Sequence, residues 1–289
     1  MNKTIVFGGS GLIGSALKRS ISKTTLNKTF VFLSRKDLNL SIFKKKAFLS
    51  TKKIFKNNTN IIFLAGIKKQ YGDTKENYIN NIKMVNNLCS IISGLKEVYI
   101  INISSTEVFD TNTNHKINEN SLKKSNTFYG KSKINSEKIL QKFSQKNKLK
   151  LAILRPAQIY GLGDYYDAYG PTQFINKAIL NENIEIWGNG SEFREFIYVN
   201  DIVKIIKFFL KKRITEEINV VSGQSYRYID IISFLKSFFS KITVISKQRT
   251  TVKSDILFDN SKLIKTLPKS YNFTKLKSGL KRYINEIKR

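Results

Sequence analysis

The sequence predicts an α/β fold: a doubly wound parallel sheet of the Rossmann type, followed by a smaller C-terminal domain. In the first half of the chain, short apolar runs rich in β-formers alternate with helical patterns. The glycines of Gly8-Gly9-Ser10-Gly11-Leu12-Ile13-Gly14 lie between the first such run and the first helical pattern. The polar residues Ser104-Ser105-Thr106 follow a later run, at the end of a strand where ligands of such sheets bind.

The expected elements follow one another as strand and helix. Residues 3–7, 29–33, 60–64 and 98–103 are the predicted strands, and residues from 12 onward, 75–93 and 126–146 are the predicted helices. A chain of 289 residues has room for one large or two moderate domains. We expect residues 1–160 to form the Rossmann domain and 161–289 the second region, with a segment near 196–210 returning to the first.

The glycine turn predicts a site for a dinucleotide. Gly8 allows the tight turn, Gly11 lets the backbone approach a pyrophosphate, and Gly14 lets the helix pack closely on the strand. Leu12 and Ile13 form the helix start, which attracts the anion. The spacing is GxxGxxG rather than GxGxxG.

Cofactor choice is expected at the end of the second strand, where an acidic residue would accept a bond from the ribose 2′-hydroxyl. Ser34-Arg35-Lys36 stands there instead, and a guanidinium suits a 2′-phosphate. The sequence therefore favours NADP(H), with NAD(H) as the alternative if Arg35 and Lys36 are only solvated cations and Asp37 reaches the ribose.

Tyr129 and Lys133 lie four residues apart and so share one face of the predicted helix. A free tyrosine has a pKa of about 10, so bringing it near neutrality requires roughly 4 kcal/mol of preferential phenolate stabilisation. Lys133 and a positively charged nicotinamide would supply it. Ser105 would then hold the reacting oxygen while Tyr129 moves its proton, during hydride transfer at a carbon bearing an alcohol.

Composition narrows the remaining classes. The formal charge of +30 rests on 51 cations, only nine of them arginines, and the lysines are scattered in twos and threes. This distribution indicates a solvated basic surface without a specific nucleic-acid partner. Cys89 is expected to be a small buried hydrophobe, and with a single histidine, His115, no metal site is predicted. No signal peptide or apolar span is visible, so we expect a soluble cytoplasmic protein without a membrane partner.

The chain resembles the extended short-chain dehydrogenases/reductases, in particular the NAD(P)-dependent epimerase/dehydratase family that acts on nucleotide-activated sugars. Beyond the motifs above, the resemblance rests on Leu64-Ala65-Gly66, Asn81, RPAQIYG at 155–161, REFIYVND at 194–201 and DNSKL at 259–263. It implies that Ser105, Tyr129 and Lys133 are the catalytic triad. It also implies that Ala65, Gly66 and Asn81 line the cofactor, and that Arg194 and Arg249 hold the substrate diphosphate.

Some positions depart from the family pattern. Gln158 stands where a substrate-binding asparagine is usual. Glu107, by contrast, agrees with one subgroup, since it falls where sugar dehydratases keep a catalytic glutamate. The resemblance implies an epimerase or dehydratase of a nucleotide sugar, with a homodimer as a compatible assembly. An NADPH-dependent 4-keto-6-deoxy nucleotide-sugar reductase, or an epimerase/reductase like the GDP-fucose synthases, stays as the alternative.

Two hypotheses lie outside this class. A catalytically silent dinucleotide-binding module would keep the glycine turn without turnover, against which the intact triad argues. An RNA-binding Rossmann protein would have to bind selectively at physiological salt. Two further features are left with two interpretations each: residues 164–171 as a substrate loop or a surface turn, and Trp187 as a base-stacking or a core or rim residue.

Overall fold

A computed structural model describes residues 2–42, 52–164, 170–250 and 252–288. The chain forms two compact units, each made of several stretches of sequence. The first comprises Met1–Asp110, Ser121–Pro156 and Val203–Ile218, and the second Thr111–Asn120, Ala157–Ile202 and Asn219–Arg289.

The first unit contains the six-stranded sheet. Its strands are arranged in the order β2-β1-β3-β4-β5-β9, and the ladders from β2 to β5 are parallel. These strands are β1 (Thr4–Phe7), β2 (Phe30–Leu33), β3 (Asn60–Phe63), β4 (Tyr99–Ile103), β5 (Lys150–Pro156) and β9 (Glu217–Val220). Because β1 lies between β2 and β3, the strand order reverses there, which is where open α/β sheets bind ligands. The predicted doubly wound sheet is confirmed.

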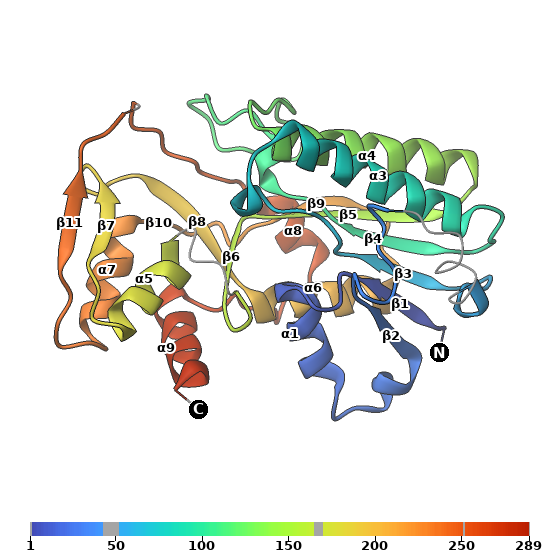
Figure 1. The fold of residues 1–289 in the computed structure, drawn as a ribbon, viewed down its shortest axis with the longest axis horizontal. Coiled ribbons are helices and arrows are strands. Elements are labelled where there is room, and N and C mark those ends of the chain that lie inside the picture. Colours follow the sequence, from blue (N-terminus) through green and yellow to red (C-terminus); the bar gives the residue numbers. More distant parts are fainter. Residues whose placement is uncertain (1, 43–51, 165–169, 251, 289) are drawn as a thin grey trace. The chain divides into compact units, whose positions relative to one another are not determined.

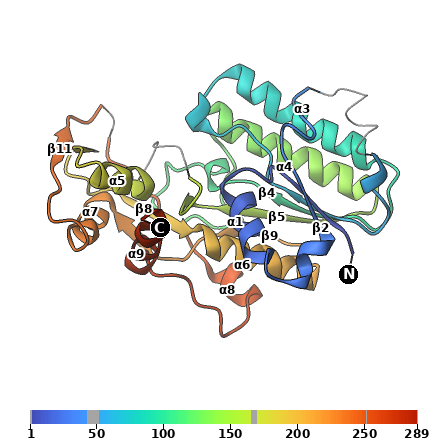
Figure 2. The same cartoon turned by 60° about the horizontal axis from the view of Figure 1, so that its bottom comes forward.

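Helices cover both faces of this sheet. Figures 1 and 2 show α3 (Lys75–Ile92) and α4 (Phe128–Lys146) side by side on one face, with α1 (Leu12–Ile21) and α6 (Val199–Lys212) on the other. Short 3-10 turns join them: η1 (Thr25–Thr29), η2 (Lys52–Ile54), η3 (Lys69–Tyr71) and η4 (Thr106–Val108). All residues of β1, β3 and β4 are buried, as expected for strands covered on both faces.

The predicted boundaries are right to within one or two residues. The largest shift is at α4, which begins at Phe128 rather than at Asn126. Thr127 is the N-cap, and its hydroxyl accepts a hydrogen bond from the backbone of Gly130. Cys89 lies on the buried face of α3 and belongs to the core, as expected.

The second unit is built from smaller sheets. One sheet has the order β10-β8-β6, and β7 pairs with β11 in a parallel ladder. The strands are β6 (Gln158–Tyr160), β7 (Ile184–Trp187), β8 (Phe193–Tyr198), β10 (Ser225–Arg227) and β11 (Val244–Lys247), and the helices α5 (Gly170–Ile179), α7 (Tyr228–Lys236), α8 (Ser261–Thr266) and α9 (Leu276–Ile287).

Two features left with alternative interpretations fall in this unit. Trp187 is a 54% exposed residue of β7 and not a core residue. Of the segment 164–171, Gly170 and Pro171 open helix α5, whereas residues 165–169 lie outside the described residues.

Candidate active site

The glycine turn joins β1 to α1 at the point where the strand order reverses. The amides of Gly8 and Gly9 both donate to the Leu33 carbonyl of the neighbouring strand, each at 3.0 Å. Gly8 has φ +81°, a conformation that favours glycine, and a Cβ there would lie 2.9 Å from the Ala65 amide nitrogen. The turn therefore brings the ends of β1 and β3 together.

Gly11 and Gly14 meet different surroundings. A Cβ on Gly14 would lie 2.5 Å from the Gly8 carbonyl oxygen, so this glycine is needed for the packing of α1 on the turn. A Cβ on Gly11 would meet only the Gly8 oxygen, at 3.4 Å. Gly11 is the N-cap of α1 without a side-chain cap, and no acidic residue stands in the first turn beside Leu12 and Ile13. A backbone surface that a side chain would cover, at a helix start, fits a pyrophosphate.

The segment after β2 presents Arg35 to solvent. Its side chain is exposed, while the Asp37 carboxylate accepts hydrogen bonds from the Ser34 amide at 2.8 Å and the Ser34 hydroxyl at 2.6 Å. These two bonds, the hydroxyl bond first, lower the pKa of Asp37. The carboxylate is thus engaged within its own turn, and the guanidinium is the group left to meet a ribose substituent.

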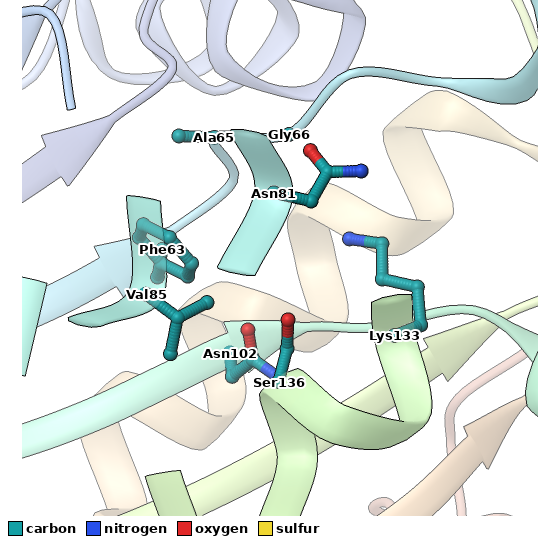
Figure 3. Close-up of a pocket in the computed structure, with 8 residues that line it drawn as sticks. All are labelled: Phe63, Ala65, Gly66, Asn81, Val85, Asn102, Lys133 and Ser136. Carbon is teal, nitrogen blue, oxygen red and sulfur yellow. The ribbon is translucent and has the colours of Figure 1, made fainter. Parts of the chain in front are cut away.

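Asn81 fixes the backbone that follows β3. Its Oδ1 accepts from the Ile67 amide at 2.7 Å, and its Nδ2 donates to the Ile67 carbonyl at 3.0 Å and to the Ser132 hydroxyl at 3.1 Å. Ala65, Gly66, Asn81 and Lys133 line one pocket, and Figure 3 shows the lysine side chain extending toward Asn81 and Gly66. A Cβ on Gly66 would lie 3.5 Å from Lys133 Nζ, so a small residue keeps this surface free.

Ser105, Tyr129 and Lys133 meet beyond the end of β4. Ser105 is the N-cap of η4, and its hydroxyl is hydrogen-bonded to the Tyr129 side chain. Lys133, one turn further along α4, donates to the Ile103 carbonyl at 3.0 Å and lies with its Nζ 5.7 Å from the centroid of the Tyr129 ring. The structure brings together the three residues that the sequence singled out.

The electrostatics of the tyrosine differ from the sequence expectation. Burial, and after it the charge of Glu107, raise the pKa of Tyr129 above its ordinary value, while the Ser105 hydrogen bond lowers it. Burial also lowers the pKa of Lys133 to about 8, an effect that the charge of Glu137 opposes. Among the protein groups, burial therefore has a larger effect on the pKa of Tyr129 than the phenolate stabilisation expected from Lys133.

Glu107 joins this group from η4. Its Oε1 lies 2.8 Å from Lys69 Nζ and accepts a 3.4 Å hydrogen bond from the Thr127 hydroxyl. Gly130 packs tightly beside it, because a Cβ there would lie 2.5 Å from the Glu107 carbonyl oxygen and would also overlap Ser125. The Glu107 side chain is 34% exposed, and its charge acts on Tyr129 of the Ser105, Tyr129 and Lys133 group.

Some polar atoms near this group are buried and without partners in the described residues. They include Asn102 Nδ2 and Ser104 Oγ, at the end of β4. Asn102 also lines the pocket with Lys133, where Figure 3 shows it beside Ser136. With the open cradle at Gly11 and the aligned hydroxyl, phenol and ammonium groups, this site fits a dinucleotide carrying a redox-active ring.

The sequence does not predict the buried ion pair of Arg155 and Glu137, which holds the catalytic helix in place. Arg155 lies in the quoted RPAQIYG motif, but its partner on α4 has no signature in the sequence. Its Nε and Nη2 donate to the two carboxylate oxygens of Glu137 at 2.7 and 2.8 Å, and Nη2 also contacts Glu217. Because Glu137 lies one helical turn after Lys133, this pair anchors the catalytic helix against β5.

The expected substrate residues belong to the second unit. Gln158 lies in β6 and its side-chain oxygen has no partner among the described residues. Arg194, in β8, donates through Nη1 to the carbonyls of Phe193 and Ser254, at 2.8 and 2.6 Å. Arg249 pairs with Glu192 and packs against Gly188. Each arginine is thus held by a different neighbour.

Metal and membrane features are negative within the part of the chain that the structure describes. No group of three or more histidine, cysteine, aspartate or glutamate side chains there could hold a metal ion. Among the same residues, no helix combines the length and apolar character that a bilayer crossing needs.

Comparison with known proteins places the chain in a family. Residues 4–221 match the model of the NAD dependent epimerase/dehydratase family. The chain belongs to this family, and NAD(P) is therefore its cofactor. The membership agrees with the site, since the match covers the glycine turn and the Ser105, Tyr129 and Lys133 group.

Curated relatives are similar at low identity. GDP-L-fucose synthase of Dictyostelium discoideum is 25% identical, over 95% of this chain and 88% of that protein. dTDP-D-glucose 4,6-dehydratase of the same organism is 27% identical over 73% of this chain, which spans only 56% of that protein. ADP-L-glycero-D-manno-heptose-6-epimerase of Brachyspira hyodysenteriae is 23% identical, over 83% and 82% of the two chains.

Solved structures share the whole fold. The Helicobacter pylori ADP-L-glycero-D-manno-heptose-6-epimerase aligns with a TM-score of 0.84 at 20% identity, covering 99% of this chain and 96% of that chain. UDP-glucuronic acid 4-epimerase from Bacillus cereus, solved with UDP-glucuronic acid and NAD, gives 0.82 at 20% identity and 99% coverage of both. At this identity the likeness establishes the fold alone.

Proposed function

We propose that this enzyme acts on a nucleotide-activated sugar by hydride transfer at a carbinol carbon of the sugar, as an epimerase or dehydratase. The observation that carries the proposal is the meeting of Ser105, Tyr129 and Lys133 at the end of β4, beside a turn fitted to a dinucleotide. The named relatives, which include an epimerase, a dehydratase and a fucose synthase, support the same substrate class.

The protein groups would divide the work as follows. Gly8, Gly11 and Gly14, with the helix start at Leu12 and Ile13, would hold the pyrophosphate. Ala65, Gly66, Asn81 and Lys133 would border the nicotinamide half of the cofactor. When bound, the nicotinamide supplies the hydride chemistry.

Proton movement would belong to Tyr129. Ser105 would hydrogen-bond the sugar hydroxyl and orient it toward the Tyr129 oxygen, which as a phenolate would take the hydroxyl proton during oxidation and as a phenol would return it during reduction. Burial raises the pKa of the Tyr129 phenol, and a positively charged ring bound nearby would lower it again by stabilising the phenolate. Glu107 would be the second proton-moving group, as a dehydratase requires at a neighbouring carbon.

Substrate binding would come from the second unit. Arg194 and Arg249 are guanidinium groups suited to bidentate contact with a diphosphate, and Gln158 offers an unpartnered amide oxygen. Arg249 would have to exchange its Glu192 partner for the phosphate.

For the cofactor we propose NADP(H) over NAD(H). Exposed Arg35, together with the engagement of Asp37 by Ser34, supports this preference, although the structures of UDP-glucuronic acid 4-epimerase from Bacillus cereus and of MoeE5 contain NAD. A homodimer and a cytoplasmic location stay predictions from the sequence.

The test is a screen of nucleotide sugars against the purified full chain, with NADPH oxidation and product analysis measured together. An epimerase or dehydratase returns its hydride, so product should form without net cofactor loss. The alternative, a 4-keto sugar reductase, would consume one NADPH for each product. NADPH binding without turnover on any nucleotide sugar would instead indicate a silent dinucleotide-binding module.

A further inference from the structure

The segment between β3 and α3 touches the catalytic group in two places. Lys69 pairs with Glu107 at 2.8 Å, and the carboxylate of Asp73 accepts a 2.9 Å hydrogen bond from the backbone amide of Tyr129. Neither residue is part of a motif quoted from the sequence. Both contacts lie within the first unit.

This segment is held at both ends by side chains of α3. Asn81 binds the amide and the carbonyl of Ile67 at its start, at 2.7 and 3.0 Å. Asn77 donates to the carbonyls of Tyr71 and Gly72 at 3.3 and 2.8 Å, near its end. Residues 67–73 therefore form a cross-linked loop whose shape is set by the same helix that lines the cofactor pocket.

The contact at Asp73 completes the cap of the catalytic helix. Thr127 satisfies the amide of Gly130, and Asp73 satisfies the amide of Tyr129, both in the first turn of α4. A carboxylate at a helix start is also favoured by the helix dipole. The backbone of the tyrosine is thus fixed by a residue 56 positions earlier in the chain.

The contact at Lys69 bears on charge. Glu107 is an anion next to the tyrosine, and an uncompensated anion there opposes formation of the phenolate. The charged groups that face Tyr129 are Glu107 from η4, Lys133 from its own helix and Asp73 at its backbone, with Lys69 acting through Glu107. Lys69 therefore offsets the charge of the Glu107 carboxylate, which raises the pKa of the Tyr129 phenol.

We propose that residues 67–73 are a positioning arm for Tyr129, in which Lys69 balances Glu107 and Asp73 fixes the tyrosine backbone. The proposal rests on the proposed function, since it assigns to Tyr129 the proton transfer. It adds Lys69 and Asp73 as positioning residues.

The backbone half of the proposal is tested without substrate, by hydrogen exchange of the Tyr129 amide. Asp73→Ala should speed this exchange by about tenfold or more, because a charge-assisted hydrogen bond is lost. Asp73→Asn keeps an acceptor oxygen and should retain most of the protection. Glu76→Ala, an exposed acidic residue in the next helix, is the matched control. Equal exchange of the Tyr129 amide in Asp73→Ala and the wild type would show that Asp73 does not fix the tyrosine backbone, and the proposal would be wrong.

The charge half is tested by the pH profile of turnover. Lys69→Gln should displace the rise of activity with pH upward by about one unit, and so reduce turnover at neutral pH by about tenfold. Lys69→Arg should keep the wild-type profile. In the double variant Lys69→Gln/Glu107→Gln, the rise of turnover with pH should return to lower pH, whether or not the maximal rate recovers.

The control for the charge half is Lys75→Gln, which removes an exposed lysine from the start of α3. The proposal would be wrong if the pH dependence of turnover were unchanged in Lys69→Gln, or if it were displaced equally in Lys75→Gln. A wild-type enzyme inactive on every nucleotide sugar would instead contradict the proposed function, and the exchange measurement would still decide whether the arm exists.

Discussion

Arg155 and Glu137 form a bidentate ion pair in which both side chains are almost completely removed from solvent, 0% and 1% exposed. The pair joins β5 to the middle of α4, the helix that carries Tyr129 and Lys133. Buried pairs are costly to break from one side, because the remaining charge is left without its partner.

We expect Glu137→Gln to lower the free energy of unfolding by about 3 kcal/mol, the low end for breaking a buried pair. Urea unfolding measures it. Glu182→Gln, at an exposed position, should change stability by less than about 0.5 kcal/mol. Equal effects in both variants would mean that Arg155 is satisfied by Glu217 alone.

Gly11 and Gly14 should separate binding from folding. Gly14→Ala forces a Cβ against the Gly8 carbonyl and should cost about 1–3 kcal/mol of stability. Gly11→Ala has room in the fold, so its unfolding free energy should change little while NADPH affinity falls, because the methyl group covers the cradle. Calorimetric titration and urea unfolding of both variants check this. Wild-type affinity in Gly11→Ala would remove the cradle from the cofactor site.

Glu195 predicts a pH dependence of stability. Burial raises its pKa to about 7, while the Gly223 amide donates to it at 2.9 Å and opposes that rise. An acid with a raised folded pKa binds more protons in the folded state, so its contribution is present below about pH 4.5 and is lost as pH rises through 7.

Relative to Glu195→Gln, the wild type should therefore lose about 3 kcal/mol of unfolding free energy between pH 4.5 and pH 8. Denaturant unfolding of both proteins at several pH values gives the difference. A constant difference across this range would show that the carboxyl ionises as freely in the folded state as in the unfolded one.

Arg35 is expected to set the cofactor preference. A guanidinium contact to the 2′-phosphate should favour NADPH over NADH by ~2 kcal/mol, or about thirtyfold. Arg35→Ala should erase most of this gap by weakening NADPH alone, whereas Lys23→Ala, another exposed cation, should not. Titrations at two salt concentrations separate the specific contact from general attraction by the lysines. Equal affinities in the wild type would assign NAD(H) instead.

Tyr129→Phe should reduce turnover by at least ~100-fold and leave cofactor affinity nearly unchanged, because only the proton-moving oxygen is removed. Lys133→Ala should damage both, since the lysine also lines the pocket that we propose borders the nicotinamide. Steady-state kinetics with fluorescence titration of NADPH test this. Wild-type turnover in Tyr129→Phe on an authentic substrate would refute its assignment as the proton donor and acceptor.

Much of the first unit could be predicted because its signals are local. The glycine turn, the buried strands and the one-turn spacing of Tyr129 and Lys133 are all written within short windows of sequence. Long-range contacts carry no such signal. Asp73 meets the amide of Tyr129 and Glu137 meets Arg155 only because the fold brings distant segments together.

The electrostatics of the site could not be predicted for a related reason. The sequence predicts that Lys133 and a positively charged nicotinamide stabilise the Tyr129 phenolate, but the size of the opposing desolvation effect depends on burial, which the fold determines. The stretch 111–120 likewise looks like a polar loop in the sequence. It groups with the second unit, where Ile117 forms a parallel bridge with Phe258.

Asn81 shows how narrow the chemical requirement at one position can be. Its side-chain oxygen accepts from the amide of Ile67 and its side-chain nitrogen donates to the carbonyl of the same residue, as the backbone of an adjacent strand would. The Asn81 amide thus pairs with the backbone that follows β3 as a peptide group would. Aspartate has the same shape but lacks the donor, and glutamine carries the same amide one methylene too far. Exchanging this nitrogen for an oxygen would therefore remove the hydrogen bond to the Ile67 carbonyl and loosen the start of the loop 67–73.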